Sequence, residues 1–197
     1  MAPLIEELQQ TLARTSDSRH VAMLSGVADL FVAGATTYSP DHVAIFDDVI
    51  SHLIENIKHP ALIELSRKLA LVGNAPTRVI HRLACDDDIA VSGPVLEHSE
   101  ALADDSLIEI ANTKSQHHLA AICGRPHISE PVTNALIERG IAEITVKVLS
   151  NEGARLSDTG FAKLINRAGA NKDLAAALAR RKDLPSELRP FLGMALA

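Results

Sequence analysis

The chain has 197 residues, of which 47% are hydrophobic and only 3% aromatic, with one Tyr and no Trp. This length suffices for a hydrophobic core without a metal or a disulfide, and that core must consist of Leu, Ile, Val and Ala, the residues typical of packed helices. The formal net charge of −6 argues against general nucleic-acid binding. Residues 1–140 carry 10 Lys and Arg against 19 Asp and Glu, whereas residues 141–197 carry 9 against 6. The N-terminal part is thus negative and the C-terminal part positive, and this difference can orient a charged partner or favour a homo-oligomer.

The N-terminal residues and the two cysteines bear on the location of the protein. Residues 1–20 include acidic side chains and no long apolar run, so we expect neither a signal peptide nor a membrane span there. Cys85 and Cys123 lie far apart, each beside apolar residues, which fits reduced, buried thiols better than a disulfide framework. The sequence therefore predicts a cytoplasmic protein.

The first third of the chain predicts long helices. Apolar residues recur every three or four positions in residues 3–13 and again in residues 18–34. Ser39 and Pro40 then have the order of an N-cap and a first helical residue, followed by a third amphipathic stretch up to Ile57. No segment alternates with a period of two for long enough to predict a strand.

Beyond about residue 60 the sequence repeats itself. Five segments share one pattern: APTRVIHRLA from Ala75, LADDSLIEIA from Leu102, ISEPVTNALI from Ile128, LSDTGFAKLI from Leu156 and LPSELRPFLG from Leu184. Their first residues, here called anchors, are 27, 26, 28 and 28 residues apart. A large aliphatic residue stands eight positions after each anchor: Leu83, Ile110, Leu136, Leu164 and Leu192. Because Pro or Ser follows four of the anchors, each segment predicts a helix start whose two apolar positions face one core.

Second helices are predicted between these segments, for example in IAEITVKVLSN and NKDLAAALARR. A helix pair of under 30 residues is too short to fold alone and is stabilised by stacking on its neighbours. The sequence therefore predicts an all-α fold, an α-solenoid of two-helix repeats of about 27 residues. We expect residues 1–58 to form an N-terminal helical cap and residues 59–197 to form the repeat array, packed as one continuous unit.

Several of these blocks carry a resemblance to a known family. The run from Asn74 to Ala111, together with HHLAAICGRPHISEPVTNALIERG and NEGARLSDTGFAKLINRA, resembles the bacterial family called domain of unknown function 2336. The resemblance extends from about Leu30 to Leu192. That family is similar in turn to HEAT-like and leucine-rich-variant helical repeats. The resemblance implies HEAT-like repeats and supplies no catalytic residues.

A metal site and carboxylate chemistry are the catalytic alternatives. His118, Cys123 and His127 are residue types that bind zinc, but their spacing on a helix and the following turn is poor, so we expect no metal and no cofactor. The acidic runs at 85–89 and 103–105 adjoin predicted helix starts, where the helix dipole explains them better than acid–base catalysis. The sequence contains no nucleophile elbow, P-loop or dinucleotide fingerprint.

The stretch GRPHISEPV, residues 124–132, resembles an active site in composition but fits the repeat. Gly124 ends one predicted helix, Ile128 is an anchor, Ser129 is the predicted N-cap and Pro131 belongs to the first turn. We interpret it as the boundary between two repeats.

These observations favour a non-catalytic interaction or scaffold module that binds a protein partner of unknown identity. The alternatives are a metal- or phosphate-handling enzyme and nucleic-acid binding through the basic C-terminal repeats. If a partner groove exists, the second helices are expected to form it. The residues predicted to contact the partner are Glu97, His117, Lys147 and Arg180.

Overall fold

The computed structural model describes residues 2–55 and 57–196, with side chains for residues 18–55 and 57–193. Within these ranges the chain is all-helical, with twelve α-helices, two short 3-10 helices and one isolated extended pairing, between Ile128 and Ala154. The predicted all-α class is therefore confirmed. The chain forms two compact units, and the boundary between them falls within the helix Ile89–His98. Unit 1 comprises Met1–Val95 and Ser99–Ala101, and unit 2 comprises Leu96–His98 and Leu102–Ala197. The cap boundary predicted after residue 58 lies within unit 1 and stays a prediction.

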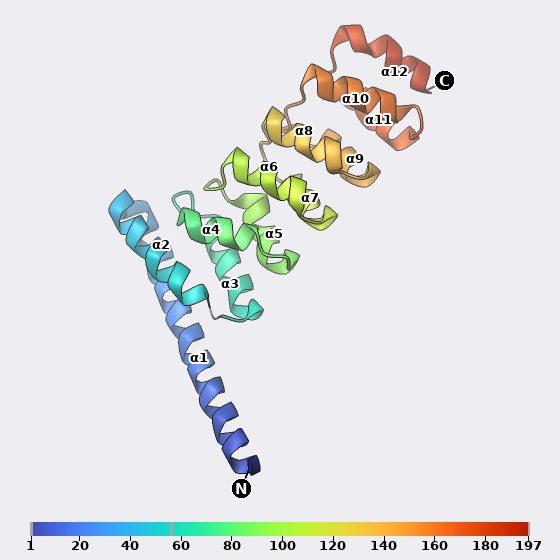
Figure 1. The fold of residues 1–197 in the computed structure, drawn as a ribbon. Coiled ribbons are helices and arrows are strands. Elements are labelled where there is room, and N and C mark those ends of the chain that lie inside the picture. Colours follow the sequence, from blue (N-terminus) through green and yellow to red (C-terminus); the bar gives the residue numbers. More distant parts are fainter. Residues whose placement is uncertain (1, 56, 197) are drawn as a thin grey trace. The chain divides into compact units, whose positions relative to one another are not determined.

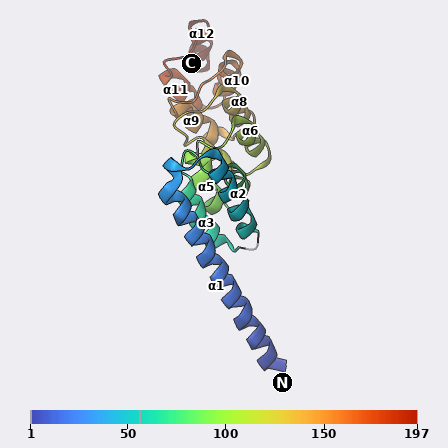
Figure 2. The same cartoon turned by 90° about the vertical axis from the view of Figure 1, so that its left-hand side faces the viewer.

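Unit 1 is built around one long helix. Its elements are α1 (Ala2–Gly34), the 3-10 helix η1 (Ala35–Thr37), α2 (Pro40–Ile54), α3 (His59–Leu69), α4 (Thr77–Ala84) and most of α5 (Ile89–His98). α1 and α4 each pack against both α2 and α3 (Figure 1). The two stretches predicted in residues 3–34 form one continuous helix, because neither Gly nor Pro separates them. The N-terminal part of α1 extends beyond the other helices of unit 1 (Figure 2).

α1 has a buried face and an exposed apolar face. Leu24 and Phe31 belong to the core, whereas Met23 and Leu30 are 52% and 59% exposed. Among the described residues, Ser18–Thr37 is the one segment whose length and composition would suit a membrane span, and 22% of its most apolar stretch is buried. A core helix of a soluble protein and a signal sequence have the same length and apolar composition. The cytoplasmic location stays a prediction.

The start of α2 confirms the predicted positions of Ser39 as N-cap and Pro40 as first helical residue. Ser39 is the N-cap, its side chain accepts a hydrogen bond from the backbone N–H of His42, and Pro40 occupies the first turn. The rings of Phe31, Tyr38 and Phe46 lie within 5.1 to 5.9 Å of one another and fix the connection from α1 to α2.

Unit 2 consists of short helices packed in a regular order. They are α6 (Asp104–Thr113), α7 (Gln116–Ile122), α8 (Glu130–Arg139), α9 (Ala142–Ser150), α10 (Asp158–Ala168), α11 (Lys172–Arg180), the 3-10 helix η2 (Ser186–Leu188) and α12 (Arg189–Leu196). The even-numbered helices α6, α8, α10 and α12 contact one another in sequence, and so do α7, α9 and α11 (Figure 1). Each helix also packs on its successor within the pairs α6–α7, α8–α9 and α10–α11.

The residues chosen from the repeat pattern belong to the core. The five anchors are at most 9% exposed: Ala75, Leu102, Ile128, Leu156 and Leu184. The five aliphatic residues eight positions later are at most 5% exposed: Leu83, Ile110, Leu136, Leu164 and Leu192. The burial predicted for both positions is confirmed, because each lies on the inward face of a short amphipathic segment.

Helix starts in unit 2 follow the predicted positions but differ in their chemistry. Ser157 caps α10, and its hydroxyl accepts from the Gly160 N–H at 3.0 Å. Ser129 is the N-cap of α8 by backbone conformation, yet its buried hydroxyl has no hydrogen-bond partner among the described residues. The predicted position of Ser129 is therefore confirmed, while the first turn of α8 receives no side-chain cap from it.

Long polar side chains join successive helix pairs in unit 2. Arg139 of α8 donates to the Ala111 carbonyl of α6 at 3.1 Å, and Arg167 of α10 donates to the Ile137 carbonyl of α8 at 2.5 Å. Corresponding bonds run from Arg125 to Leu96, Lys147 to Ala120, Asn151 to Cys123 and Arg181 to Asn151. Donor and acceptor are 27 to 30 residues apart in all six pairs. The helix-end carbonyls, which have no partner within their own helix, are thus satisfied by the following pair.

Backbone pairing adds a further connection in unit 2. The N–H of Ile128 donates to the Gly153 carbonyl, and the N–H of Arg155 donates to the Ile128 carbonyl, which gives a short parallel bridge between two loops. A Cβ atom at position 153 would overlap the carbonyl oxygen of Pro126. Gly153 is therefore required for the close approach of the two loops.

Gly153→Ala is expected to lower the free energy of unfolding by about 1–3 kcal/mol, because the added methyl group must displace backbone. Gly26→Ala is the matched control, since a Cβ placed there has no atom within 4 Å apart from its chain neighbours and the backbone of its own helix. In the interior of α1 this change should instead stabilise by about 0.5–1 kcal/mol. Urea unfolding followed by circular dichroism measures both; equal effects of the two substitutions would contradict the role given to Gly153.

Candidate interaction surface

The four residues predicted to contact a partner lie on the expected helices of unit 2. Glu97 is in α5, His117 in α7, Lys147 in α9 and Arg180 in α11. Three of the four are exposed: His117, Lys147 and Arg180. Glu97 is half-buried and lies against Gly124, since a Cβ atom added at position 124 would be 2.8 Å from Glu97 Oε1. The helix positions are thus accessible, although no ligand contact is established for any of the four residues.

A groove runs between α9 and α11 and brings one of these four residues into a defined surface. Its lining residues are Ala142, Glu143, Val146 and Ser150 from α9, and Asn171, Asp173, Ala176, Ala177 and Arg180 from the α11 segment. A second hollow continues from it at Ser150, Ala177 and Arg180 and adds Leu149, Glu152, Arg181, Lys182 and Asp183. Arg180 stands where the two hollows meet.

The two helices run in the same direction along this groove, because Arg181, which follows α11, donates to the carbonyls of Leu149 and Asn151 at the end of α9. Glu143 and Asp173, both in the first turn of their helix, line it together, and Ser150 and Arg180 line it at the C-terminal ends. The floor between these ends consists of small or short apolar side chains, including Val146, Ala176 and Ala177. A floor of this kind admits close approach of another backbone.

Arg181 holds the C-terminal wall of the groove in place. Arg181 as a whole is 8% exposed, and its guanidinium donates to the carbonyls of Asn151 at 2.6 Å and Ala154 at 2.8 Å. It also binds both carboxylate oxygens of Asp183, at 2.8 and 2.6 Å. These hydrogen bonds hold the pKa of the Asp183 carboxyl below its usual range. The wall is therefore fixed by the buried guanidinium of Arg181, whose N–H groups are all engaged in hydrogen bonds, next to the exposed Arg180.

The residues considered for a metal do not converge. His118 is buried and its Nδ1 lies 2.8 Å from the Ser115 hydroxyl, while His127 is exposed in the loop before α8. Cys123 is buried, and burial raises the pKa of its thiol to about 12. No group of three or more His, Cys, Asp or Glu residues in the described part of the chain has metal-binding geometry.

The acidic runs have the capping geometry that the sequence predicts. Asp88 caps α5 by accepting from the Ala90 N–H at 2.9 Å, and Asp86 accepts from the Asp88 N–H at 2.8 Å. Asp104 and Asp105 occupy the first turn of α6. Their carboxylates therefore complement helix N-termini.

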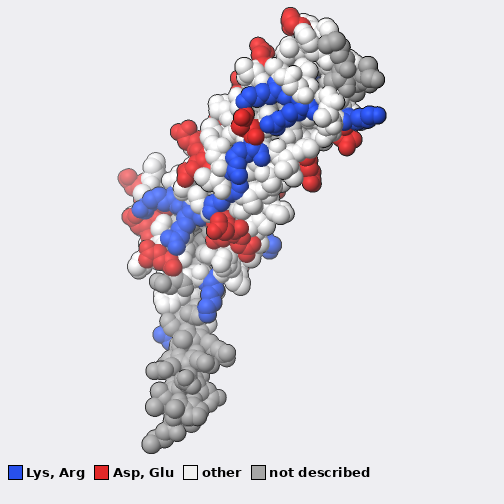
Figure 3. All heavy atoms as spheres, turned by 45° about the vertical axis from the view of Figure 1, so that its right-hand side comes forward, with Lys and Arg blue, Asp and Glu red and all other residues white. Residues whose placement is uncertain are grey.

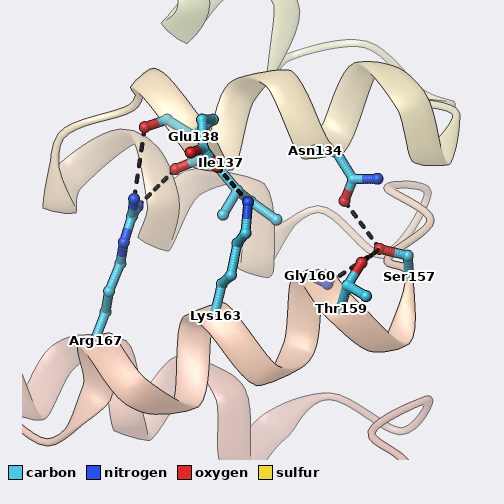
Figure 4. Close-up of polar contacts among 8 residues, drawn as sticks. All are labelled: Asn134, Ile137, Glu138, Ser157, Thr159, Gly160, Lys163 and Arg167. Carbon is cyan, nitrogen blue, oxygen red and sulfur yellow. Dashed lines mark hydrogen bonds and ion pairs between the residues drawn. The ribbon is translucent and has the colours of Figure 1, made fainter.

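The opposite row of helices uses its polar side chains to join α8 and α10. Figure 4 shows Ser157 donating to Asn134, Lys163 paired with Glu138, and Arg167 reaching the carbonyls of α8. On the face of unit 2 seen in Figure 3, basic side chains lie beside acidic ones. The positive balance of the C-terminal third therefore does not form one continuous basic surface on that face.

Sequence reasoning missed most of the groove. It named Lys147, which donates to the Ala120 carbonyl of α7, whereas the nearby Glu143, Val146 and Ser150 of α9 line the groove. The signal that could have found them is the spacing of Glu143, Val146 and Ser150, three and seven positions apart, which Asp173, Ala176 and Arg180 repeat in α11.

The described part of the chain is all-helical and has a groove between α9 and α11. A family model described as an uncharacterised protein conserved in bacteria (DUF2336) matches residues 91–192, just over half of the chain. The chain belongs to this family, as the sequence resemblance predicted. No curated protein and no solved structure matches it.

Cys123 is expected to be unreactive in the folded protein. With its pKa near 12, only about one thiol in 10⁴ is ionised at pH 8, and the thiolate is the reactive form. A Cys85→Ser variant, which keeps Cys123, should react with a thiol reagent only after denaturation. A Cys123→Ser variant, which keeps the half-buried Cys85, is the control. Rapid labelling of native Cys85→Ser would contradict the buried position of Cys123.

Arg181→Lys is expected to lower the free energy of unfolding by about 2–3 kcal/mol, because an ammonium group cannot bind two carboxylate oxygens and the loop carbonyls together. Arg180→Lys, one position earlier and exposed, should change it by less than about 0.5 kcal/mol. Chemical denaturation of the two variants compares a buried and an exposed arginine in the same segment. Similar losses in both would refute the role of Arg181 in the wall.

Proposed function

We propose that the protein is a non-catalytic α-solenoid of HEAT-like two-helix repeats that binds a partner protein through the groove between α9 and α11. Support for the repeat architecture comes from the buried anchors, spaced by 26 to 28 residues, and from the six side-chain bonds that span 27 to 30 residues. Stacked helix pairs of this kind provide extended binding surfaces.

The observation that carries the binding proposal is the difference between the two helix rows of unit 2. Between α8 and α10, Lys163 and Arg167 are engaged with α8. Between α9 and α11, the exposed Glu143, Asp173 and Arg180 surround a floor of small residues. A small apolar floor with a charged rim is typical of a protein–protein contact.

The alternatives have less support from the same residues. Nucleic-acid binding needs many cations directed at phosphates, but Lys163, Arg167 and Arg181 are bound to carboxylates or carbonyls. An enzyme would require a set of converging catalytic groups, whereas His118, Cys123 and His127 differ in burial and in the groups they contact. We therefore favour a scaffold or adaptor role. Two cysteines without a disulfide support its assignment to the cytoplasm.

Site-specific photo-crosslinking in bacterial cells tests this function. Benzoylphenylalanine replaces Ala176 in the groove or, as a matched control, Ala162, an exposed alanine on α10 outside it. We expect a discrete cross-linked partner from position 176, none from position 162, and loss of the product when Arg180→Glu is added. A folded protein that yields the same products from both positions, or none from position 176, would refute binding in the groove.

A further inference from the structure

The groove between α9 and α11 has opposite charge at its two ends. The N-terminal end carries Glu143 and Asp173, and the C-terminal end carries Arg180 and, beyond it, Lys182. All four side chains belong to exposed residues. Glu152 and Asp183 also line the C-terminal hollow, but Asp183 is bound to Arg181. The groove therefore has an acidic end, a small apolar middle and a C-terminal end at which the exposed cations Arg180 and Lys182 outnumber the exposed Glu152.

The direction of α9 and α11 adds a dipole to these charges. Both helices present their N-termini at the acidic end, because their C-terminal ends adjoin at the second hollow. An incoming helix that runs antiparallel places its own C-terminus there, so the helix dipoles attract. Ordinary helices favour acidic residues in their first turn and basic residues in their last, and an antiparallel helix brings each of these to the complementary end of the groove.

We propose that this groove binds an α-helix of the partner that runs antiparallel to α9 and α11, with an acidic first turn, small residues on the contact face and a basic last turn. This inference rests on the proposed function and specifies the chemistry of its partner. Acidic residues of the bound helix face Arg180 and Lys182, and its basic residues face Glu143 and Asp173.

The dimensions of the groove agree with such a ligand. Asp173 and Arg180 are seven residues apart in α11, a rise of about 10 Å along the helix axis. A bound helix of two to three turns covers this length. Ala176 and Ala177 between them, together with Val146 of α9, leave room for a helix that itself presents Ala, Gly or Ser.

Selection from a peptide library tests the orientation and the charge pattern. The probe is a displayed library of 14-residue helical peptides with alanine on one face and randomised residues in the first and last turns, selected against the full purified chain. Three proteins are compared: wild type, a groove variant with Glu143→Lys, Asp173→Lys, Arg180→Glu and Lys182→Glu, and a control variant with Glu109→Lys and Arg189→Glu. Both variants keep the net charge, and both control residues are exposed and outside the groove.

We expect wild type and the control variant to select peptides with acidic first turns and basic last turns, and the groove variant to select the reverse order. A peptide selected on wild type should bind the groove variant at least about tenfold more weakly, since several surface charge pairs are inverted together. Failure to enrich peptides, enrichment without an order of charges, or the same order for all three proteins would overturn the inference.

The two proposals fail in different ways. If photo-crosslinking at position 176 identifies a partner while selected peptides show no charge order, the groove binds protein but not by the proposed antiparallel helix. If the charge order is selected and inverts as expected while position 176 yields no partner in cells, the groove has the inferred chemistry and the proposed function is refuted.

Discussion

The structure of unit 2 depends on how its short helices satisfy their terminal carbonyl groups. An α-helix leaves its last four carbonyls without a partner in the helix, so a helix of nine residues such as α11 leaves nearly half unpaired. Arg139, Arg167 and Arg181 each supply donors to the end of a helix one pair earlier. Because a guanidinium carries five N–H groups, one side chain can satisfy several carbonyls at once.

This arrangement separates residues that hold the fold from residues that can bind. The cations that reach backwards to carbonyls, such as Arg167 and Arg181, have few donors left for a ligand. Arg180, the last residue of α11 and the one directly before Arg181, instead lines the groove with its side chain exposed. Two adjacent arginines therefore have different tasks, and their sequence context alone does not distinguish them, since the distinction depends on where α11 ends and on the direction of each side chain.

The sequence was sufficient for the helices and their inward faces but not for the groove. Anchors such as Ile128 and Leu156 could be predicted because burial of one apolar face is a local property of an amphipathic segment. The cap hydroxyl of Ser129 could not, because its burial without a partner depends on neighbouring helices. The groove was missed because the spacing shared by α9 and α11 marks one face on each helix, whereas only the relative rotation of the two helices decides whether those faces meet.

The charge at the ends of the groove follows from ordinary helix stability. An acidic residue in the first turn stabilises its own helix, so Glu143 and Asp173 have a local reason to be where they are. Because α9 and α11 are parallel neighbours, these two carboxylates line the same end of the groove. The groove becomes acidic at that end although neither helix alone determines this. α7 carries no acidic residue in its first turn and no basic residue in its last, so it brings no such charges to its contact with α9. The α9–α11 groove thus combines two helices that each contribute an acidic first turn, which is why we locate the ligand-orienting charges there.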